Sequence, residues 1–141
     1  MTRARAELVA AIRKAAGDGM TQAQIALQTG RSQPEISRLL RFHGTSALAR
    51  RLRQHASQIK QVLAAVGGTN LRVFGSVATG GDKEGSDIDL LFTMGSPLSL
   101  MEIAATEHRM AEILGVDVDL VPDVSLRPDL RSRIMSEAVA L

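Results

Sequence analysis

The sequence predicts an α+β protein, with an all-α N-terminal module followed by a domain that has a small mixed sheet flanked by helices. The charge predicts the division: residues 1–66 carry 11 basic and 3 acidic residues, a net +8, whereas residues 67–141 carry 6 basic and 12 acidic ones, a net −6. Apolar residues recur at helical spacing in the first half, and short apolar runs alternate with glycine-rich turns in the second. We expect domains at 1–44 and 45–141.

The amino-acid composition excludes several classes of protein. The 141 residues are 45% hydrophobic and 23% charged, and no apolar run reaches the roughly 18 to 20 residues that a membrane-spanning helix needs. The absence of cysteine excludes disulfides, thiol catalysis and cysteine-ligated zinc, and it fits a reducing cytoplasm. The absence of Trp and Tyr argues against stacking of single-stranded nucleic acid on aromatic rings. We expect a cytoplasmic protein with no membrane partner.

Helix-start signals are clear in the basic half. Thr21 and Ser32 are followed three residues later by Gln24 and Glu35, which is the pattern of a capping box. Pro34 lies in the first turn of the second of these helices, where its missing N–H costs no hydrogen bond. The expected helices cover residues 2–16, 22–29, 33–41 and 46–66.

Short apolar runs bounded by turn residues predict strands in the acidic half. Gly75-Ser76 ends the first run, a glycine-rich loop over 80–85 precedes the second, and Gly115 precedes the third. Pro128 opens the last helix. The expected strands are 71–74, 87–92 and 116–121, and the expected helices are 99–114 and 128–140.

Residues 21–40 have the features of two short helices that cross at a tight turn. Gly30 supplies the positive φ that the turn needs, and Ile36 and Leu39 would pack the second helix onto Ile25. This segment resembles a helix-turn-helix of the repressor-like, XRE type. We therefore interpret the N-terminal module as a helix-turn-helix DNA-binding domain.

The helix-turn-helix resemblance implies that the second helix contacts double-stranded operator DNA. The candidate contact residues are Arg31, Gln33, Ser37, Arg38 and Arg41. Because operators repeat about one helical turn apart, useful binding would require a homodimer. The alternative is that the helices only pack together and serve protein contact or dimerisation.

A second group of residues points to phosphate chemistry. Asp87 and Asp89 lie two apart on an expected strand, so both carboxylates leave the same face, and Asp119 lies on a neighbouring strand. Such an all-oxygen site suits Mg²⁺. Gly75-Ser76, at the end of a strand, offers backbone N–H groups and a hydroxyl to a phosphate. Together these residues suit phosphoryl or nucleotidyl transfer with two Mg²⁺ ions and ATP.

The Gly-Ser pair, a spacer of ten residues and the Asp-x-Asp pair resemble the DNA polymerase β-like nucleotidyltransferase superfamily. Within it, the sequence is most similar to the minimal nucleotidyltransferases, which include antitoxins paired with HEPN toxins. The resemblance covers about residues 46–141. It implies that Gly75 and Ser76 bind the nucleotide's phosphates and that Asp87 and Asp89 ligate both metal ions.

The same resemblance makes Asp119 the third metal ligand and a catalytic residue that helps to deprotonate the acceptor hydroxyl. Asp117 lies on the same face and is the alternative third carboxylate. Members of the family commonly carry Arg where this chain has Thr79, so a cationic phosphate contact is missing, and Lys83 or Arg72 is the expected replacement. Glu107 is expected to be a solvated charge. Met101 and Met110 are expected to fill the core.

The favoured function is transfer of AMP from ATP to a hydroxyl of a partner protein that resembles a HEPN toxin. A protein acceptor is favoured because only 97 residues follow residue 44, too few to enclose a small acceptor. In this interpretation the chain is an antitoxin, and its helix-turn-helix represses its own operon. The alternative is a DNA-binding transcriptional regulator whose nucleotidyltransferase domain is inactive and serves protein interaction. A third interpretation, modification of a small molecule, would need a dimer to build the pocket.

Overall fold

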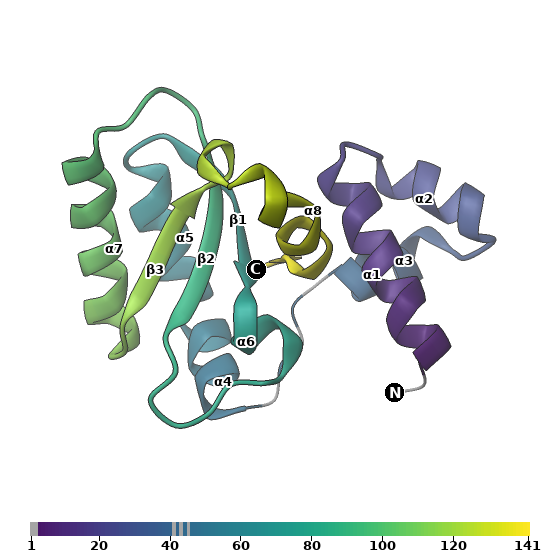
Figure 1. Ribbon diagram of the computed structural model, residues 1–141, viewed down its shortest axis with the longest axis horizontal. Helices are drawn as coiled ribbons and strands as arrows, with labels where there is room; N and C mark the ends of the chain where they lie inside the picture. Colours follow the sequence, from purple (N-terminus) through teal and green to yellow (C-terminus); the bar gives the residue numbers. More distant parts are fainter. Residues whose placement is uncertain (1–2, 41, 43, 45) are drawn as a thin grey trace.

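The computed structural model describes residues 3–40, 42, 44 and 46–141. Figure 1 shows the N-terminal helices on one side of the molecule and the sheet with its covering helices on the other. Among the described residues, no helix is both long and apolar enough to span a bilayer. The N-terminal helices are α1 (Arg3–Gly17), α2 (Gln22–Thr29) and α3 (Gln33–Leu40).

The N-terminal helices pack around a small apolar cluster of their own. Ile12, Ile25 and Ile36, from α1, α2 and α3, are all buried in it. The capping box predicted at Thr21 is present, since its hydroxyl accepts from the Gln24 N–H at 3.1 Å. Gly30 ends α2 with a φ of 68°, as the turn requires. The helices predicted in this part of the chain are confirmed.

The helix predicted over residues 46–66 is wrong as a single element. The chain forms α4 (Ala47–Gln54) and α5 (Ala56–Ala64), separated at His55, whose φ of −106° and ψ of 10° lie outside the helical range. The His55 ring instead bonds locally, with Nδ1 2.9 Å from Gln58 Oε1. The break contains no glycine or proline, and the apolar residues keep their helical spacing across it. The sequence therefore predicts one helix where the chain forms two.

The described strands form one mixed sheet of four strands in the order β3-β2-β1-β4. Strands β1 and β2 are antiparallel, β2 and β3 are parallel, and β4 is antiparallel to β1. The mixed sheet predicted from the sequence is therefore confirmed. The strands are β1 (Gly68–Phe74), β2 (Ile88–Met94), β3 (Val118–Pro122) and β4 (Val139–Ala140).

The last helix is shorter than predicted. Helix α8 (Pro128–Glu137) ends before residue 140, and Val139–Ala140 turn into the edge strand β4. The backbone of β4 pairs with β1, and the Leu141 N–H donates to the Leu71 carbonyl at 3.1 Å. The sheet therefore takes residues that continue a helical pattern in the sequence, because pairing satisfies an open edge of β1.

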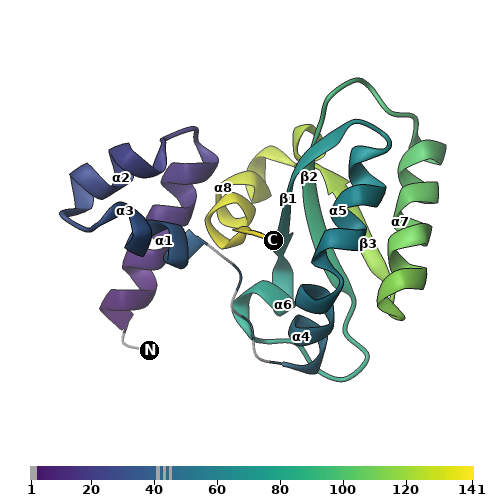
Figure 2. The same ribbon diagram turned by 180° about the vertical axis from the view of Figure 1, so that it is seen from behind.

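The two faces of the sheet are covered by different helices. Figure 2 shows α5 and α7 (Leu100–Leu114) lying over one face, where Val73, Leu90 and Leu120 pack in the main core. The opposite face packs on α8 through a second cluster that includes Leu91 and Met135. The short helices α6 (Gly75–Thr79) and η1 (Asp123–Ser125) follow β1 and β3 directly.

The N-terminal helices dock onto the C-terminal part of the chain. Gly17 of α1 lies so close to Met135 of α8 that an added Cβ would come within 2.9 Å of its methyl group. The Phe42 N–H donates to the Ala140 carbonyl at 3.1 Å, and the Phe42 ring packs in the main core. Phe42 is thus fixed to the edge of the sheet.

Candidate active site

The acidic residues predicted from the sequence gather at one end of the sheet. Asp89 is opposite Phe74 of β1 and opposite Asp119 of β3 in the strand register. Asp87 comes directly before β2 and is exposed, as is Asp119, whereas Asp89 is half-buried. Strand β1 ends in α6 at the same end where β2 and β3 begin (Figure 1). The alternation of the strands therefore brings Asp89 and Asp119 to one face, as expected.

Burial and two nearby negative charges act on the Asp89 carboxylate. Burial, followed by the negative charges of Asp119 and Asp87, raises the pKa of Asp89 from 3.8 to about 6. Asp117 is not among the causes of this shift, and its backbone carbonyl accepts from the Ile88 N–H at 3.0 Å. Of the two candidate third carboxylates, Asp119 is therefore the one that is in register with Asp89 and whose charge contributes to this shift.

The donor chemistry of these carboxylates fits a divalent cation. The negative charges of Asp119 and Asp87, which add to the effect of burial on Asp89, favour a bound cation, and Mg²⁺ prefers carboxylate oxygens. Within the described residues, however, no three acidic or histidine side chains are close enough together to form a ready-made metal site. A cation held here would have to draw the exposed carboxylates of Asp87 and Asp119 toward Asp89.

Gly75 approaches the Asp89 carboxylate more closely than any other residue type could. Its φ is 71°, in the left-handed region, and a Cβ added there would overlap Asp89 Oδ2. Gly75 is also the first residue of α6, and Ser76 follows it in the first turn, half-buried. Gly75 of the predicted phosphate-binding pair therefore lies directly beside the Asp89 carboxylate.

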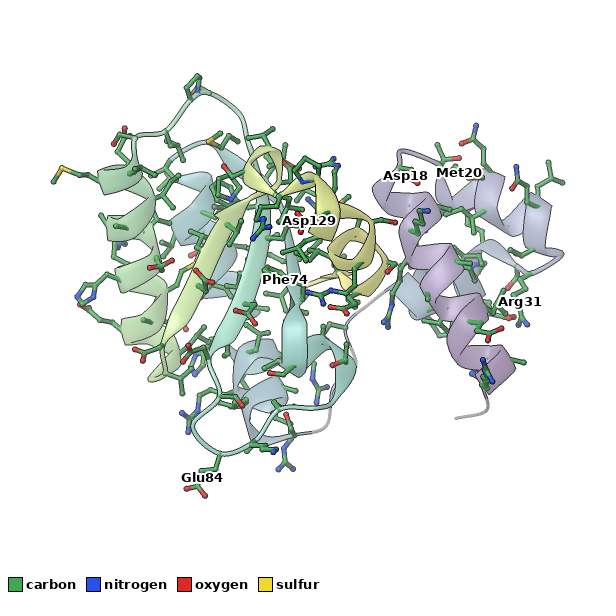
Figure 3. The ribbon with its side chains drawn as sticks, in the orientation of Figure 1. Asp18, Met20, Arg31, Phe74, Glu84 and Asp129 are labelled. Atoms are coloured by element: carbon green, nitrogen blue, oxygen red, sulfur yellow. The ribbon has the colours of Figure 1, made fainter. Side chains whose placement is uncertain are left out.

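Thr79 does not offer a phosphate contact in place of arginine. Its hydroxyl lies 3.3 Å from the Gly75 carbonyl and 3.4 Å from that of Ser76, so it donates within α6. Lys83 is exposed in the loop before β2, which Figure 3 shows projecting outward at Glu84. Lys83 as the replacement for the family's arginine stays a prediction.

Arg72 is committed elsewhere, so its predicted role as a phosphate contact is wrong. The side chain is only 6% exposed, and Nη2 forms an ion pair with Asp123 Oδ2 at 3.2 Å. Nη1 lies 3.5 Å from Met135 Sδ, and Thr93 donates to the same Asp123 oxygen at 2.7 Å. Arg72 therefore ties β1 to η1 and α8, away from α6.

Sequence reasoning missed the role of Glu107. Its carboxylate accepts the Leu120 N–H at 2.8 Å, so it satisfies an outward-facing donor of the edge strand β3 next to Asp119. The expectation of a solvated charge is wrong, since no local motif predicts a contact between α7 and β3. Met110 is buried as expected, but Met101 is 84% exposed and does not fill the core.

The candidate DNA-contacting residues differ in how exposed they are. Gln33 and Arg38 are exposed on α3. Arg31 forms an ion pair with Glu35 at 2.9 Å, and Figure 3 shows it at the end of the N-terminal module farthest from the sheet. Ser37 is partly buried and lines a groove with Arg53 and Lys60 of α4 and α5. Arg41 lies outside the described residues.

Comparison with known proteins adds an independent line of evidence. Residues 52–141 match the family described as a nucleotidyltransferase domain. A protein of Methanocaldococcus jannaschii that carries the name of a protein adenylyltransferase is 40% identical over 67 residues, which cover 48% of this chain and 72% of the relative. Protein adenylyltransferase MntA of Thermococcus cleftensis is 32% identical over 80 residues, or 57% of this chain and 81% of the relative.

Solved structures give the same result for the fold. A structure described as a minimal nucleotidyltransferase is 34% identical, with a TM-score of 0.61 over 70% of this chain and all of the other. A structure of the MntA–HpeT toxin–antitoxin, in a mutant form, is 22% identical, with a TM-score of 0.51 over 61% of this chain and 69% of the other. The second likeness shows the fold alone.

Proposed function

The chain belongs to the nucleotidyltransferase domain family, and on that premise we propose that it transfers AMP from ATP to a hydroxyl of a partner protein. The observation that carries this proposal is the register of Asp89 with Asp119, beside Gly75 at the end of β1. Asp87 and Asp119 are exposed, so a hydroxyl on another macromolecule can reach them. Relatives that are named protein adenylyltransferases support a protein as the acceptor.

Each residue has a distinct task in the proposed reaction. Gly75 and Ser76 hold the nucleotide's phosphates through backbone N–H groups and the Ser76 hydroxyl. Asp87 and Asp89 would hold two Mg²⁺ ions, and Asp119 would share in holding one of them. When bound, Mg²⁺ neutralises the triphosphate and lowers the pKa of the attacking hydroxyl.

Atoms and charge balance in this transfer. The acceptor oxygen forms a bond to the α-phosphorus of ATP, the bond between the α-phosphorus and its bridging oxygen breaks, and pyrophosphate leaves with the electron pair. The proton of the hydroxyl passes to the Asp119 carboxylate, which is exposed and can release it to solvent. Asp119 is preferred over Asp117 because it is in register with Asp89 and its charge contributes to the raised pKa of Asp89.

We place the acceptor on a toxin of the HEPN type, with this chain as the antitoxin. The sequence contains no tyrosine, so it cannot modify itself on a tyrosine hydroxyl. The relative from Thermococcus cleftensis, 32% identical, carries the name MntA, and a protein of that name was solved as part of the toxin–antitoxin MntA–HpeT; this is a property of those proteins and supports the same class of partner here. An acceptor tyrosine would therefore lie on the partner chain.

The decisive experiment incubates the chain with α-labelled ATP, Mg²⁺ and the protein encoded next to it. Label is expected on the partner, and the Asp87→Asn/Asp89→Asn double variant is expected to transfer none. Asp117→Asn is the matched control, because it removes one exposed carboxylate at the same end of the sheet and should keep activity. Full transfer by the double variant would overturn the proposal.

A second candidate function is DNA binding by α2 and α3. Gly30 in the left-handed region makes the tight turn between the two helices, and Gln33 and Arg38 are exposed on α3. The net charge of +8 over residues 1–66 favours a polyanion partner. If the transferase is active, DNA binding would regulate the operon of the enzyme. If the transferase is inactive, DNA binding would be the main function of the protein.

Mobility-shift titrations with DNA from upstream of the gene test the second function. Affinity is expected to fall steeply as salt is raised, because neutralised phosphates release counterions. Arg38→Ala should weaken binding, whereas Arg109→Ala, the same loss of charge on α7, should not. Equal affinities for the two variants, or binding that ignores salt, would refute a specific role for α3.

A further inference from the structure

A cavity of about 330 Å³ lies where the N-terminal helices meet the sheet domain. Its walls come from both halves of the chain: Arg13, Met20 and Thr21 on one side, and Asn70, Arg72 and Met135 on the other. None of the proposed transferase residues lines it. A cavity of this size is within the range that small ligands occupy.

Arg13 is the unusual residue of this cavity. Its Nε is buried and has no hydrogen-bond partner, and the described part of the chain gives the side chain neither a hydrogen bond nor an ion pair. Burial lowers the pKa of Arg13 below its ordinary value, which reflects the cost of taking a cation out of water. A partly buried guanidinium without a counter-ion is unfavourable unless an anion joins it.

Arg72, on the opposite wall of the cavity, is a second arginine, but its charge is balanced by a carboxylate. Its charge is balanced by Asp123 at 3.2 Å, and its Nε donates to the Asn70 carbonyl at 3.3 Å. No acidic side chain is among the described residues that line the cavity, so nothing there balances Arg13 in the same way. The cavity therefore has one uncompensated positive charge.

We propose that this cavity binds a small organic anion whose phosphate or carboxylate group pairs with the Arg13 guanidinium. A guanidinium presents donors in a fork that matches either group. The thioethers of Met20 and Met135 and the side chain of Leu40 offer apolar surface beside the charge, which suits an organic body more than a bare inorganic ion.

The position of the cavity gives such a ligand a structural consequence. Arg13 belongs to α1, whereas Asn70 and Arg72 belong to β1 and Met135 to α8. A ligand bound between them contacts both halves of the chain, so it favours the docked arrangement by mass action. The ligand would thereby control how firmly the N-terminal helices are held against the sheet domain.

Methionine methyl NMR can test this proposal on the whole chain, without Mg²⁺. Met20 and Met135 line the cavity, whereas Met101 is exposed on α7 and Met110 is buried in the main core, so the protein contains its own controls. The probes are inorganic phosphate, AMP and benzoate, at constant ionic strength. Saturable shifts of Met20 and Met135, with Met101 and Met110 unmoved, are expected for AMP, benzoate or both.

Variants separate this cavity from the transferase site. Arg13→Gln should weaken probe binding about tenfold or more, Arg13→Lys should keep part of it, and Asp89→Asn should leave it unchanged. An unchanged Met110 signal shows that each variant is folded. The proposal is overturned if no organic probe gives saturable shifts at Met20 and Met135 in the unaltered protein. It is overturned equally if binding survives Arg13→Gln, or is lost only in Asp89→Asn. Because these readouts do not depend on AMP transfer, their failure would leave the proposed function standing.

Discussion

Asp89 and Asp119 face each other across the parallel strands β2 and β3, and their carboxylates leave the same face of the sheet. Strand pairing thus holds two negative charges side by side, and Asp87 adds a third nearby. Folding gains nothing from this arrangement, because like charges in register destabilise a sheet. Its consequence is a local cost to stability that a bound cation would remove.

We expect Asp89→Asn to be more stable than the unaltered chain at pH 7.5. The pKa of Asp89 is raised from 3.8 to about 6 in the folded state, so the fold favours the protonated form. The stability that this group contributes is therefore fully present below pH 3.8 and is lost as the pH rises through about 6. After allowance for partial exposure, the gain is on the order of 1 kcal/mol. Thermal unfolding of both proteins between pH 4 and pH 7.5 measures it, and a gain that does not shrink toward pH 4 would contradict the assignment.

Mg²⁺ should raise the melting temperature of the unaltered chain and leave that of Asp87→Asn/Asp89→Asn nearly unchanged. A ligand that binds only the folded state stabilises it, by about 2.7 kcal/mol when its concentration is 100 times its Kd. Differential scanning fluorimetry with increasing MgCl₂ measures the effect, with NaCl at equal ionic strength as the control. Chelation of the metal should also stop AMP transfer. Equal stabilisation of both proteins would argue against these carboxylates as the ligands.

Gly75→Ala should abolish AMP transfer, whereas Gly85→Ala should not. Both glycines have positive φ, 71° and 85°, so both substitutions carry backbone strain of about 1 kcal/mol. Only at Gly75 does the added methyl group overlap the Asp89 carboxylate, since the space around Gly85 is open. Transfer assays and melting curves of the two variants isolate the steric effect. Similar activities would mean that the contact with Asp89 does not matter.

Removal of the Glu107 carboxylate should destabilise the protein and slow transfer. Glu107→Ala leaves the Leu120 N–H on the edge of β3 without its acceptor, at an expected cost of about 1 to 3 kcal/mol. Glu107→Gln keeps an acceptor oxygen and should restore most of the loss. Unfolding by denaturant measures the stability of each variant. Glu112→Ala, which removes an exposed carboxylate on the same helix, is the control. A loss from Glu112→Ala as large as that from Glu107→Ala would remove the special role of this contact.

Features that depend on local chemistry could be predicted from the sequence. The capping residue at Thr21 and the left-handed glycines at Gly30 and Gly115 end or begin helices where expected, because each acts within a few residues of itself. The alternation of a strand likewise placed Asp89 on one face with Asp119, whereas the strand begins at Ile88, so Asp87 lies just outside it. The DNA and metal roles of the candidate residues stay predictions.

Features that depend on contacts between distant segments could not be predicted. The ion pair of Arg72 with Asp123 joins residues 51 apart, and Glu107 reaches Leu120 only because α7 packs beside β3. Val139 continues the pattern of a helix, and it becomes a strand because β1 has an open edge. In each case the partner is decided by the packing of elements, which no local pattern contains.

The bond from the Phe42 N–H to the Ala140 carbonyl also sets an order of events during protein synthesis. At about 5 to 20 residues per second, a ribosome makes residue 140 roughly 5 to 20 seconds after residue 42. Until then Phe42 and the outer edge of β1 have no β4 strand to pair with. The N-terminal helices therefore leave the ribosome before the surface that receives them exists, and they dock only once translation has passed β4.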